Sequence, residues 1–150
     1  MTATLIVLLI ITLLAILILP FSRALMKDRE ELYENPLPKK FAILIRQINY
    51  GLMDGMGEIV EFKKDPRIIN LFDEGLPNML IHFRYSTGSL VISLFYKYFN
   101  AELKKEMTFH DLRDADTFKQ MDVANQFMEE CTLAITKHRK ECDERFSKMY

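Results

Sequence analysis

The 150-residue chain contains no tryptophan, only two cysteines and only five glycines. Three of the glycines, Gly51, Gly55 and Gly57, are close together, but they lack the GxxxxGK[ST] order of a phosphate-binding loop. An excess of positive charge is also missing, because the net charge is −1 and basic residues are interleaved with acidic ones. These absences exclude a P-loop site and argue against nucleic acid as a partner.

Charge is absent from residues 2–22, a run of 21 apolar or small residues. As a helix this run is about 30 Å long, which matches the hydrocarbon thickness of a bilayer. Nothing basic precedes the run, whereas Arg23, Lys27 and Arg29 follow it. The order favours a retained anchor over residues 1–22 that contacts the lipid bilayer through residues 2–22. By the positive-inside rule, it predicts a single-pass protein of the cell membrane with its N-terminus outside and its C-terminal domain in the cytoplasm.

Two other interpretations of the run stay open. Ser22-Arg23-Ala24 offers small residues at a spacing that a signal peptidase accepts, and Pro20 favours a helix break just before them. A cleaved signal would export the remaining domain. The alternative is a buried helix of a soluble fold.

Residues 23–37 carry charges of both signs and are predicted to form a solvated juxtamembrane connector. Asn35-Pro36 and Pro38 are expected to stop any helix that continues out of the bilayer, because proline lacks the amide donor and restricts the residue before it. The folded domain is therefore predicted over residues 38–150, a length typical of one small domain.

The domain pattern predicts an α+β fold. Apolar residues at steps of three and four predict a helix over 41–59, and Asp65-Pro66 resembles the start of a short helix that closes at Gly75. Alternating residues then predict a meander of three antiparallel strands between Asn78 and His110, with a turn at 86–89. The three strands are expected to be flanked by helices.

A long amphipathic helix is predicted at the C-terminal end of the chain. Asp114-Ala115-Asp116 supplies negative charge and capping oxygens at its start. At about 45 Å for some thirty residues it exceeds the width of a small domain, so its distal end is expected to protrude or to pair. Its apolar stripe is the candidate interaction face, formed by Met121, Met128, Cys131, Ile135, His138 and Cys142.

This stripe does not predict a metal centre. His138 and Cys142 are four residues apart on one face, but Cys131 is about 10 Å farther along the helix, and a structural zinc takes four ligands. The two cysteines are about 16 Å apart along the axis, which is too far for a disulfide within the helix. We expect no metal, no cofactor and free thiols, which suit a reducing cytosol.

No catalytic motif is recognisable. His110 and the aspartates that follow it fit a polar strand-to-helix turn, and His82 has no serine or cysteine nucleophile in a recognisable motif near it. The sequence therefore favours a membrane-anchored, non-enzymatic interaction or scaffold protein that presents its domain to a protein partner or to itself. The alternatives are an enzyme or small-ligand domain with a site near His82 and His110, or an exported domain.

Overall fold

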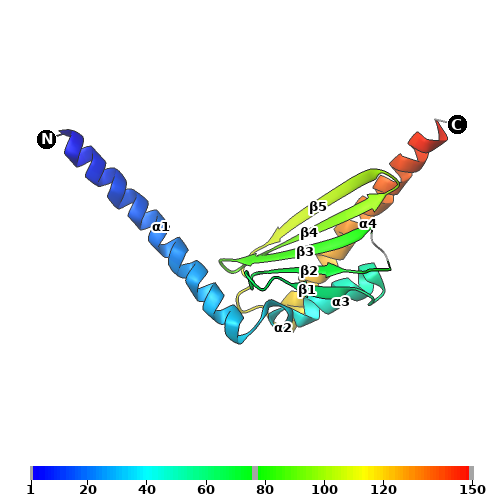
Figure 1. Cartoon of the computed structure of the whole chain (residues 1–150), viewed down its shortest axis with the longest axis horizontal. Coiled ribbons are helices and arrows are strands. Elements are labelled where there is room, and N and C mark those ends of the chain that lie inside the picture. Colours follow the sequence, from blue (N-terminus) through cyan, green and yellow to red (C-terminus); the bar gives the residue numbers. More distant parts are fainter. Residues whose placement is uncertain (1, 76–77, 149–150) are drawn as a thin grey trace.

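The computed structural model describes residues 2–75 and 78–148, and it has the predicted α+β class. A long N-terminal helix leads into a five-stranded sheet, and a long helix ends the chain (Figure 1). From the N-terminus the elements are α1 (Thr2–Glu34), α2 (Leu37–Lys40), α3 (Ala42–Met53), β1 (Glu58–Glu61), β2 (Ile68–Phe72), β3 (Met79–Ser86), β4 (Ser89–Tyr98), β5 (Ala101–Phe109) and α4 (Thr117–Ser147).

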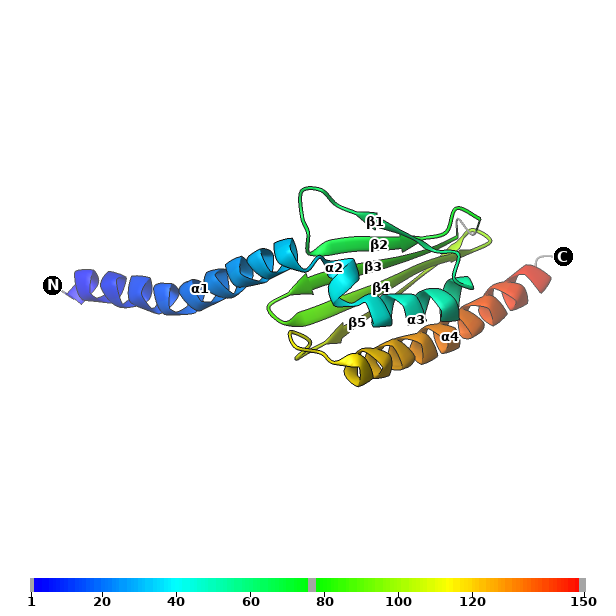
Figure 2. The ribbon, with the colours of Figure 1, turned by 90° about the horizontal axis from the view of Figure 1, so that it is seen from below.

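The sheet is an antiparallel meander in the order β1-β2-β3-β4-β5. Helices α3 and α4 cover one of its faces (Figure 2), and alternate strand residues point into the resulting core. Ile81 and Phe83 of β3 are buried on this face, for example, whereas Arg84 points to the open face and is exposed. This alternation of burial matches the alternating residues that predicted the strand.

The three predicted strands are confirmed, but the sheet contains two more. The helix predicted after Asp65-Pro66 is wrong, because Ile68–Phe72 forms β2 with alternating burial. The carboxylate of Asp65 accepts hydrogen bonds from the Arg67 guanidinium at 2.8 and 2.9 Å and from its amide at 3.1 Å, which fixes a turn before the strand. The β-branched Ile68 and Ile69 then favour an extended chain.

The helix predicted over 41–59 is too long, since α3 ends at Met53. Asp54 and Gly55 adopt left-handed backbone conformations, with φ of 52° and 78°. The Asn49 side chain then holds Gly57 by accepting from its amide at 2.8 Å and donating to its carbonyl at 2.9 Å. This pair of hydrogen bonds turns the chain back, so that residues 58–61 form β1 and not the last helical turn.

Helix α4 is confirmed as a long helix that starts near Asp116, whose carboxylate caps it by accepting from the Lys119 amide at 2.8 Å. Its first half packs on α3 and on the sheet. At its far end, Phe146 stacks on Phe99 of the β4–β5 turn with ring centroids 5.3 Å apart. The distal turns extend toward the C-terminus along this hairpin (Figure 1).

Helix α1 is one continuous helix of 33 residues that runs through Pro20 and ends, as predicted, just before Asn35-Pro36. It has the length and composition of a membrane span or a signal sequence, and none of its most apolar 18-residue window is buried. The connector differs from the expectation of a solvated segment, because Asp28 and Leu32 are 0% and 1% exposed. The end of α1 is therefore packed against the domain.

Candidate functional site

The most elaborate polar cluster in the described residues lies where α1 meets the domain, and we call it the junction cluster: Asp28, Glu31, Lys40, Tyr85, Thr87 and Arg113. Its centre is the carboxylate of Asp28. One oxygen accepts from the Arg113 guanidinium at 2.6 Å, and the other accepts from the Thr87 amide. A fully buried carboxylate is thus paired with a cation and a backbone donor, as its burial requires.

Two loops deliver these partners to α1. In the β3–β4 turn, Thr87 and Gly88 have φ of 53° and 78°, the left-handed pair of a tight hairpin turn. In the loop between β5 and α4, the Leu112 amide donates to the Gly88 carbonyl at 2.8 Å. This bond ties the two loops together, so that Thr87 and Arg113 meet Asp28 from neighbouring positions.

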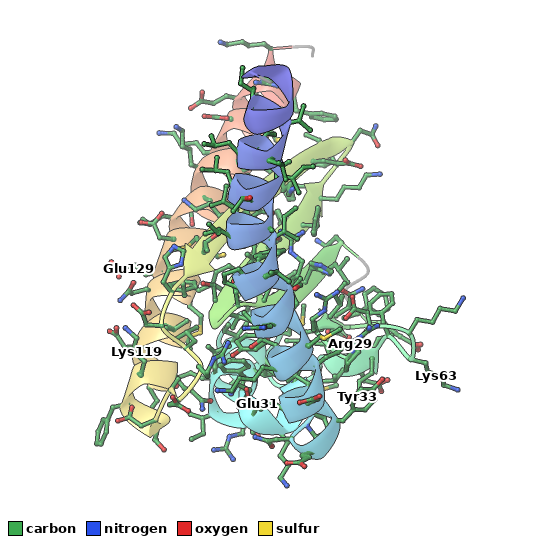
Figure 3. All side chains as sticks on the ribbon, turned by 90° about the vertical axis from the view of Figure 1, so that its left-hand side faces the viewer. Arg29, Glu31, Tyr33, Lys63, Lys119 and Glu129 are labelled. Carbon is green, nitrogen blue, oxygen red and sulfur yellow. The ribbon has the colours of Figure 1, made fainter. Side chains whose placement is uncertain are left out.

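A second ion pair lies beside the first. Lys40 forms an ion pair with Glu31 of α1 and donates to the Arg113 carbonyl at 2.5 Å. Lys40 also lies 5.5 Å from the ring centre of Tyr85. Figure 3 shows Glu31 near the domain end of α1, with Arg29 and Tyr33 on the side of the loop that carries Lys63.

The Tyr85 hydroxyl is buried and has no hydrogen-bond partner within residues 2–75 and 78–148. Burial raises the pKa of Tyr85 far above its usual value, and the carboxylates of Asp28 and Glu31 raise it further. The phenol is therefore neutral at physiological pH. It contributes packing against Phe41, whose ring centre lies 5.6 Å away.

Sequence reasoning missed the junction cluster. In the sequence, Asp28 is one of the mixed charges of the predicted solvated connector, and Arg113 belongs to no recognisable motif. One signal was available, because Asp28 and Leu32 lie four residues apart on the same side of a helix. Their common burial shows that this side of α1 belongs to the domain.

The predicted interaction face on α4 packs largely inside the domain. Cys131 is fully buried and Cys142 is 9% exposed. Met128 packs so closely on Gly51 of α3 that a Cβ atom added to Gly51 would lie 2.2 Å from the Met128 sulfur. Met128 and Ile135 pack against the core, and His138 is half-buried beside Tyr96. Met121 is 39% exposed, the most of the six. Partner binding by this face stays a prediction.

His82 and His110, the residues of the rival enzymatic interpretation, do not converge. His82 lies mid-strand on the open sheet face and shares a 2.7 Å hydrogen bond with Asn70. His110 follows β5 and shares a hydrogen bond with Ser89 of β4. His82 pairs across the strands with Ser93, which is four positions farther along β4 than Ser89. That spacing is about 13 Å along a strand. Burial and the charge of Arg84 lower the pKa of His82, which favours the neutral form of the ring.

In the described part of the chain, no group of three or more His, Cys, Asp or Glu side chains is arranged so that it could hold a metal ion. The polar stretch after β5 acts as a turn and a helix cap, with Asp111 in a left-handed conformation and Asp116 at the cap. The Cys142 sulfur lies 3.8 Å from the Nε2 atom of His138, and the same nitrogen lies 3.3 Å from the Ala101 carbonyl oxygen, so this pair forms local hydrogen bonds.

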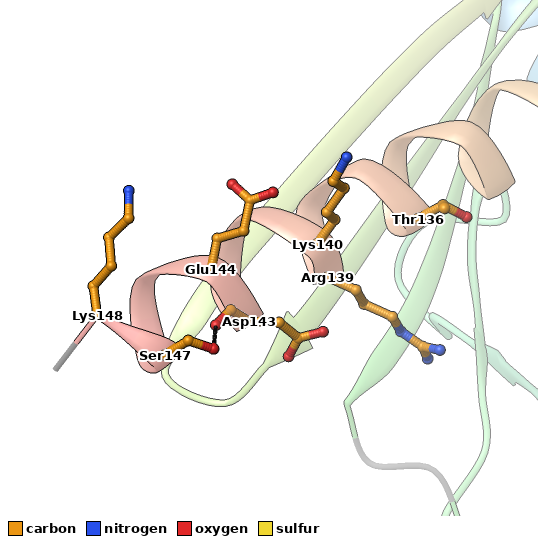
Figure 4. Close-up of a pocket in the computed structure, with 7 residues that line it drawn as sticks. All are labelled: Thr136, Arg139, Lys140, Asp143, Glu144, Ser147 and Lys148. Atoms are coloured by element: carbon orange, nitrogen blue, oxygen red, sulfur yellow. Dashed lines mark hydrogen bonds between the residues drawn. The ribbon is translucent and has the colours of Figure 1, made fainter. Parts of the chain in front are cut away.

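A hollow of about 910 Å³ lies along the last turns of α4 and is lined by residues of that helix and by Lys148 directly after it (Figure 4). Thr136, Arg139, Lys140 and Glu144 line it, and Ser147 bonds the Asp143 carbonyl within the helix. Because no second element provides an opposite wall, this hollow is an open helix flank and not a binding cavity. Two smaller hollows, of about 290 and 120 Å³, lie beside β1 and are lined by several elements.

Comparisons with known proteins identify no relative, because no family model, no curated protein and no solved structure matches the chain.

Proposed function

We propose that the chain is a membrane-anchored, non-enzymatic interaction or scaffold protein that presents its α+β domain at the cytoplasmic face of the cell membrane. The observation that carries the proposal is the continuity of α1. The same helix has an exposed apolar part and, beyond residue 22, a part that is docked on the domain through Asp28 and Leu32. A docked helix would hold the domain at a defined position relative to the membrane that contains the apolar part of α1.

The lengths support a position close to the bilayer surface. Asp28 follows Ser22 by six residues, or about 9 Å of helix. The headgroup layer on each side of the hydrocarbon core is roughly 5 to 8 Å thick. The loops that carry Thr87 and Arg113 are therefore proposed to lie just below the headgroups, with Arg23 and Lys27 at the boundary.

The polar groups of the open sheet face support a binding role over a catalytic one. His82 is held by Asn70, and the Ser93 hydroxyl donates to the Glu106 carboxylate at 2.9 Å. The carboxylate is already held by that hydroxyl and by Lys104, 3.4 Å away, and these contacts lower the pKa of Glu106. Side chains that satisfy one another in pairs stabilise a surface, whereas a catalytic group needs to be directed at a substrate.

The test separates an anchor from a cleaved signal. The full-length chain carries a reporter after Tyr150 that is active only in the cytoplasm, and membranes are extracted at high pH. We expect an active reporter and a chain that stays in the membrane with its N-terminal residues intact. A mature product that begins near Leu25 and is free outside the cytoplasm would overturn the proposal.

A further inference from the structure

The two edges of the sheet differ in chemistry. β5 at one edge is a nine-residue strand with charged side chains at Glu102, Lys104 and Glu106, and Lys105 pairs with Glu130 of α4 at 2.7 Å. Charged residues on an edge strand oppose the addition of another strand. β5 is therefore a protected edge.

β1 forms the other edge and lacks this protection in its centre. All four of its residues are exposed, including Ile59 and Val60 at 43% and 48%, and Phe62 just after the strand is 44% exposed. Within the described residues no strand pairs with its outer side, and Figure 2 shows no ribbon beyond it. Unpaired backbone groups beside apolar side chains make a template for one more strand.

Two hollows lie on the helix side of this edge. The first, about 290 Å³, is lined by Ile59 together with Ala42, Ile45 and Tyr50 of α3. The second, about 120 Å³, is lined by Glu61 and Phe62 together with Pro36 and Leu37. Ile59 and Glu61 are two residues apart and so point to the same face of the sheet. Side chains at alternate positions of an added strand would lie over one hollow each.

The charges of β1 select the kind of strand that fits. Glu58 and Glu61 flank Ile59 and Val60, and Lys63 lies beyond the strand in the following turn. Antiparallel pairing of β1 with a second copy would place four glutamates in one short ladder, and like charges across strands are destabilising. A strand with lysine or arginine opposite the glutamates avoids this repulsion.

We propose that the outer edge of β1 is a strand-addition site for an extended segment of a partner protein, with apolar side chains opposite Ile59 and Val60 and basic side chains opposite Glu58 and Glu61. The backbone ladder supplies affinity, and the two hollows supply specificity. This site gives the proposed interaction function a surface and a class of partner, and it rests on that function.

The experiment uses the full-length chain in lipid nanodiscs and a displayed library of random peptides as the probe. Peptides are selected on the wild-type chain, and the binding of the selected peptides is measured on Ile59→Lys, Ala42→Trp and the matched control Thr108→Lys. Ile59→Lys places a charge at the apolar edge, Ala42→Trp fills the larger hollow, and Thr108→Lys places the same charge on the β5 edge. Circular dichroism checks that each variant is folded.

We expect selected sequences in which basic residues flank a pair of apolar residues, a loss of at least about tenfold in affinity for both β1-side variants, and no loss for Thr108→Lys. Hydrogen exchange should slow at residues 58–61 in the complex. Peptides that bind all variants equally, failure to select any peptide, or a dimer that Ile59→Lys dissociates would each overturn the proposal. None of these results changes the anchor test, so the two proposals can fail separately.

Discussion

Asp28 and Arg113 form an ion pair at 2.6 Å across 85 residues of sequence, and it links the helix that carries the apolar run to the loop that starts α4. The carboxylate is fully buried, while the arginine side chain is 28% exposed. The ion pair therefore couples α1 to the loop between β5 and α4. Whatever fixes α1 also fixes the start of the longest helix of the domain.

Removal of Arg113 should destabilise the domain more than removal of Asp28. Arg113→Met leaves a buried carboxylate with only the Thr87 amide as a partner, whereas Asp28→Asn leaves a partly exposed arginine that water can solvate. We expect Arg113→Met to lower the free energy of unfolding by about 3 kcal/mol and Asp28→Asn by about 1 to 2 kcal/mol. Urea unfolding of the full-length chain in detergent measures both.

Glu30→Gln is the matched control, because Glu30 is an exposed carboxylate in the same part of α1. It should change stability by less than about 0.5 kcal/mol. Equal losses for Glu30→Gln and Asp28→Asn would contradict the assignment of Asp28 to the core of the junction.

A fragment that begins at residue 38 should be less stable than one that begins at residue 24. The shorter fragment loses Leu32, which is 1% exposed, and the Asp28 carboxylate. Burial of a leucine side chain contributes about 1.5 to 3 kcal/mol, so the difference in unfolding free energy should be at least about 2 kcal/mol. Thermal unfolding of the two purified fragments tests this, and equal melting temperatures would support the predicted domain boundary at residue 38.

The sequence predicted correctly the elements that neighbouring residues determine, such as turns and helix caps. The β3–β4 turn follows from Thr87-Gly88, and the start of α4 follows from the capping Asp116, because turns and caps are built from neighbouring residues. β2 was predicted as a helix because Asp65-Pro66 is a common helix start. Its outcome was decided by Arg67, which holds the Asp65 carboxylate in a turn, and by pairing with β3.

Long-range pairing explains the part of the candidate site that could not be predicted. Asp28 and Lys40 belong to no motif, and their roles depend on partners that reach them only in the folded chain. Lys40, for example, donates to the carbonyl of Arg113, which is 73 residues away in the sequence. The edge position of β1 is of the same kind. Residues 58–61 form an edge strand because α3 ends at Met53 and the left-handed turn at Asp54 and Gly55 returns the chain to the sheet.

Tyr85→Phe should stabilise the domain. The hydroxyl of Tyr85 is buried without a partner in the described residues, and an unsatisfied buried polar group costs about 1 to 3 kcal/mol. We expect a gain of about 1 kcal/mol in unfolding free energy. Tyr96→Phe is the matched control with the opposite sign, because the Tyr96 hydroxyl accepts from the Arg139 Nε atom at 2.6 Å. A loss of stability in Tyr85→Phe would show that the hydroxyl is bonded in solution.

The stability of the domain should fall at alkaline pH partly because of Cys131. Burial raises the pKa of this thiol to about 12, whereas an unfolded cysteine ionises near 8.5. Because the folded pKa is the higher one, the contribution is fully present below about pH 8.5 and is lost as the pH rises toward 12. Between pH 8 and 10, Cys131→Val should therefore lose about 2 kcal/mol less than wild type in urea unfolding. Cys142→Val, which keeps Cys131, is the control and should retain the wild-type slope. If both variants lose stability equally between these pH values, the buried thiol of Cys131 is not the cause of the slope.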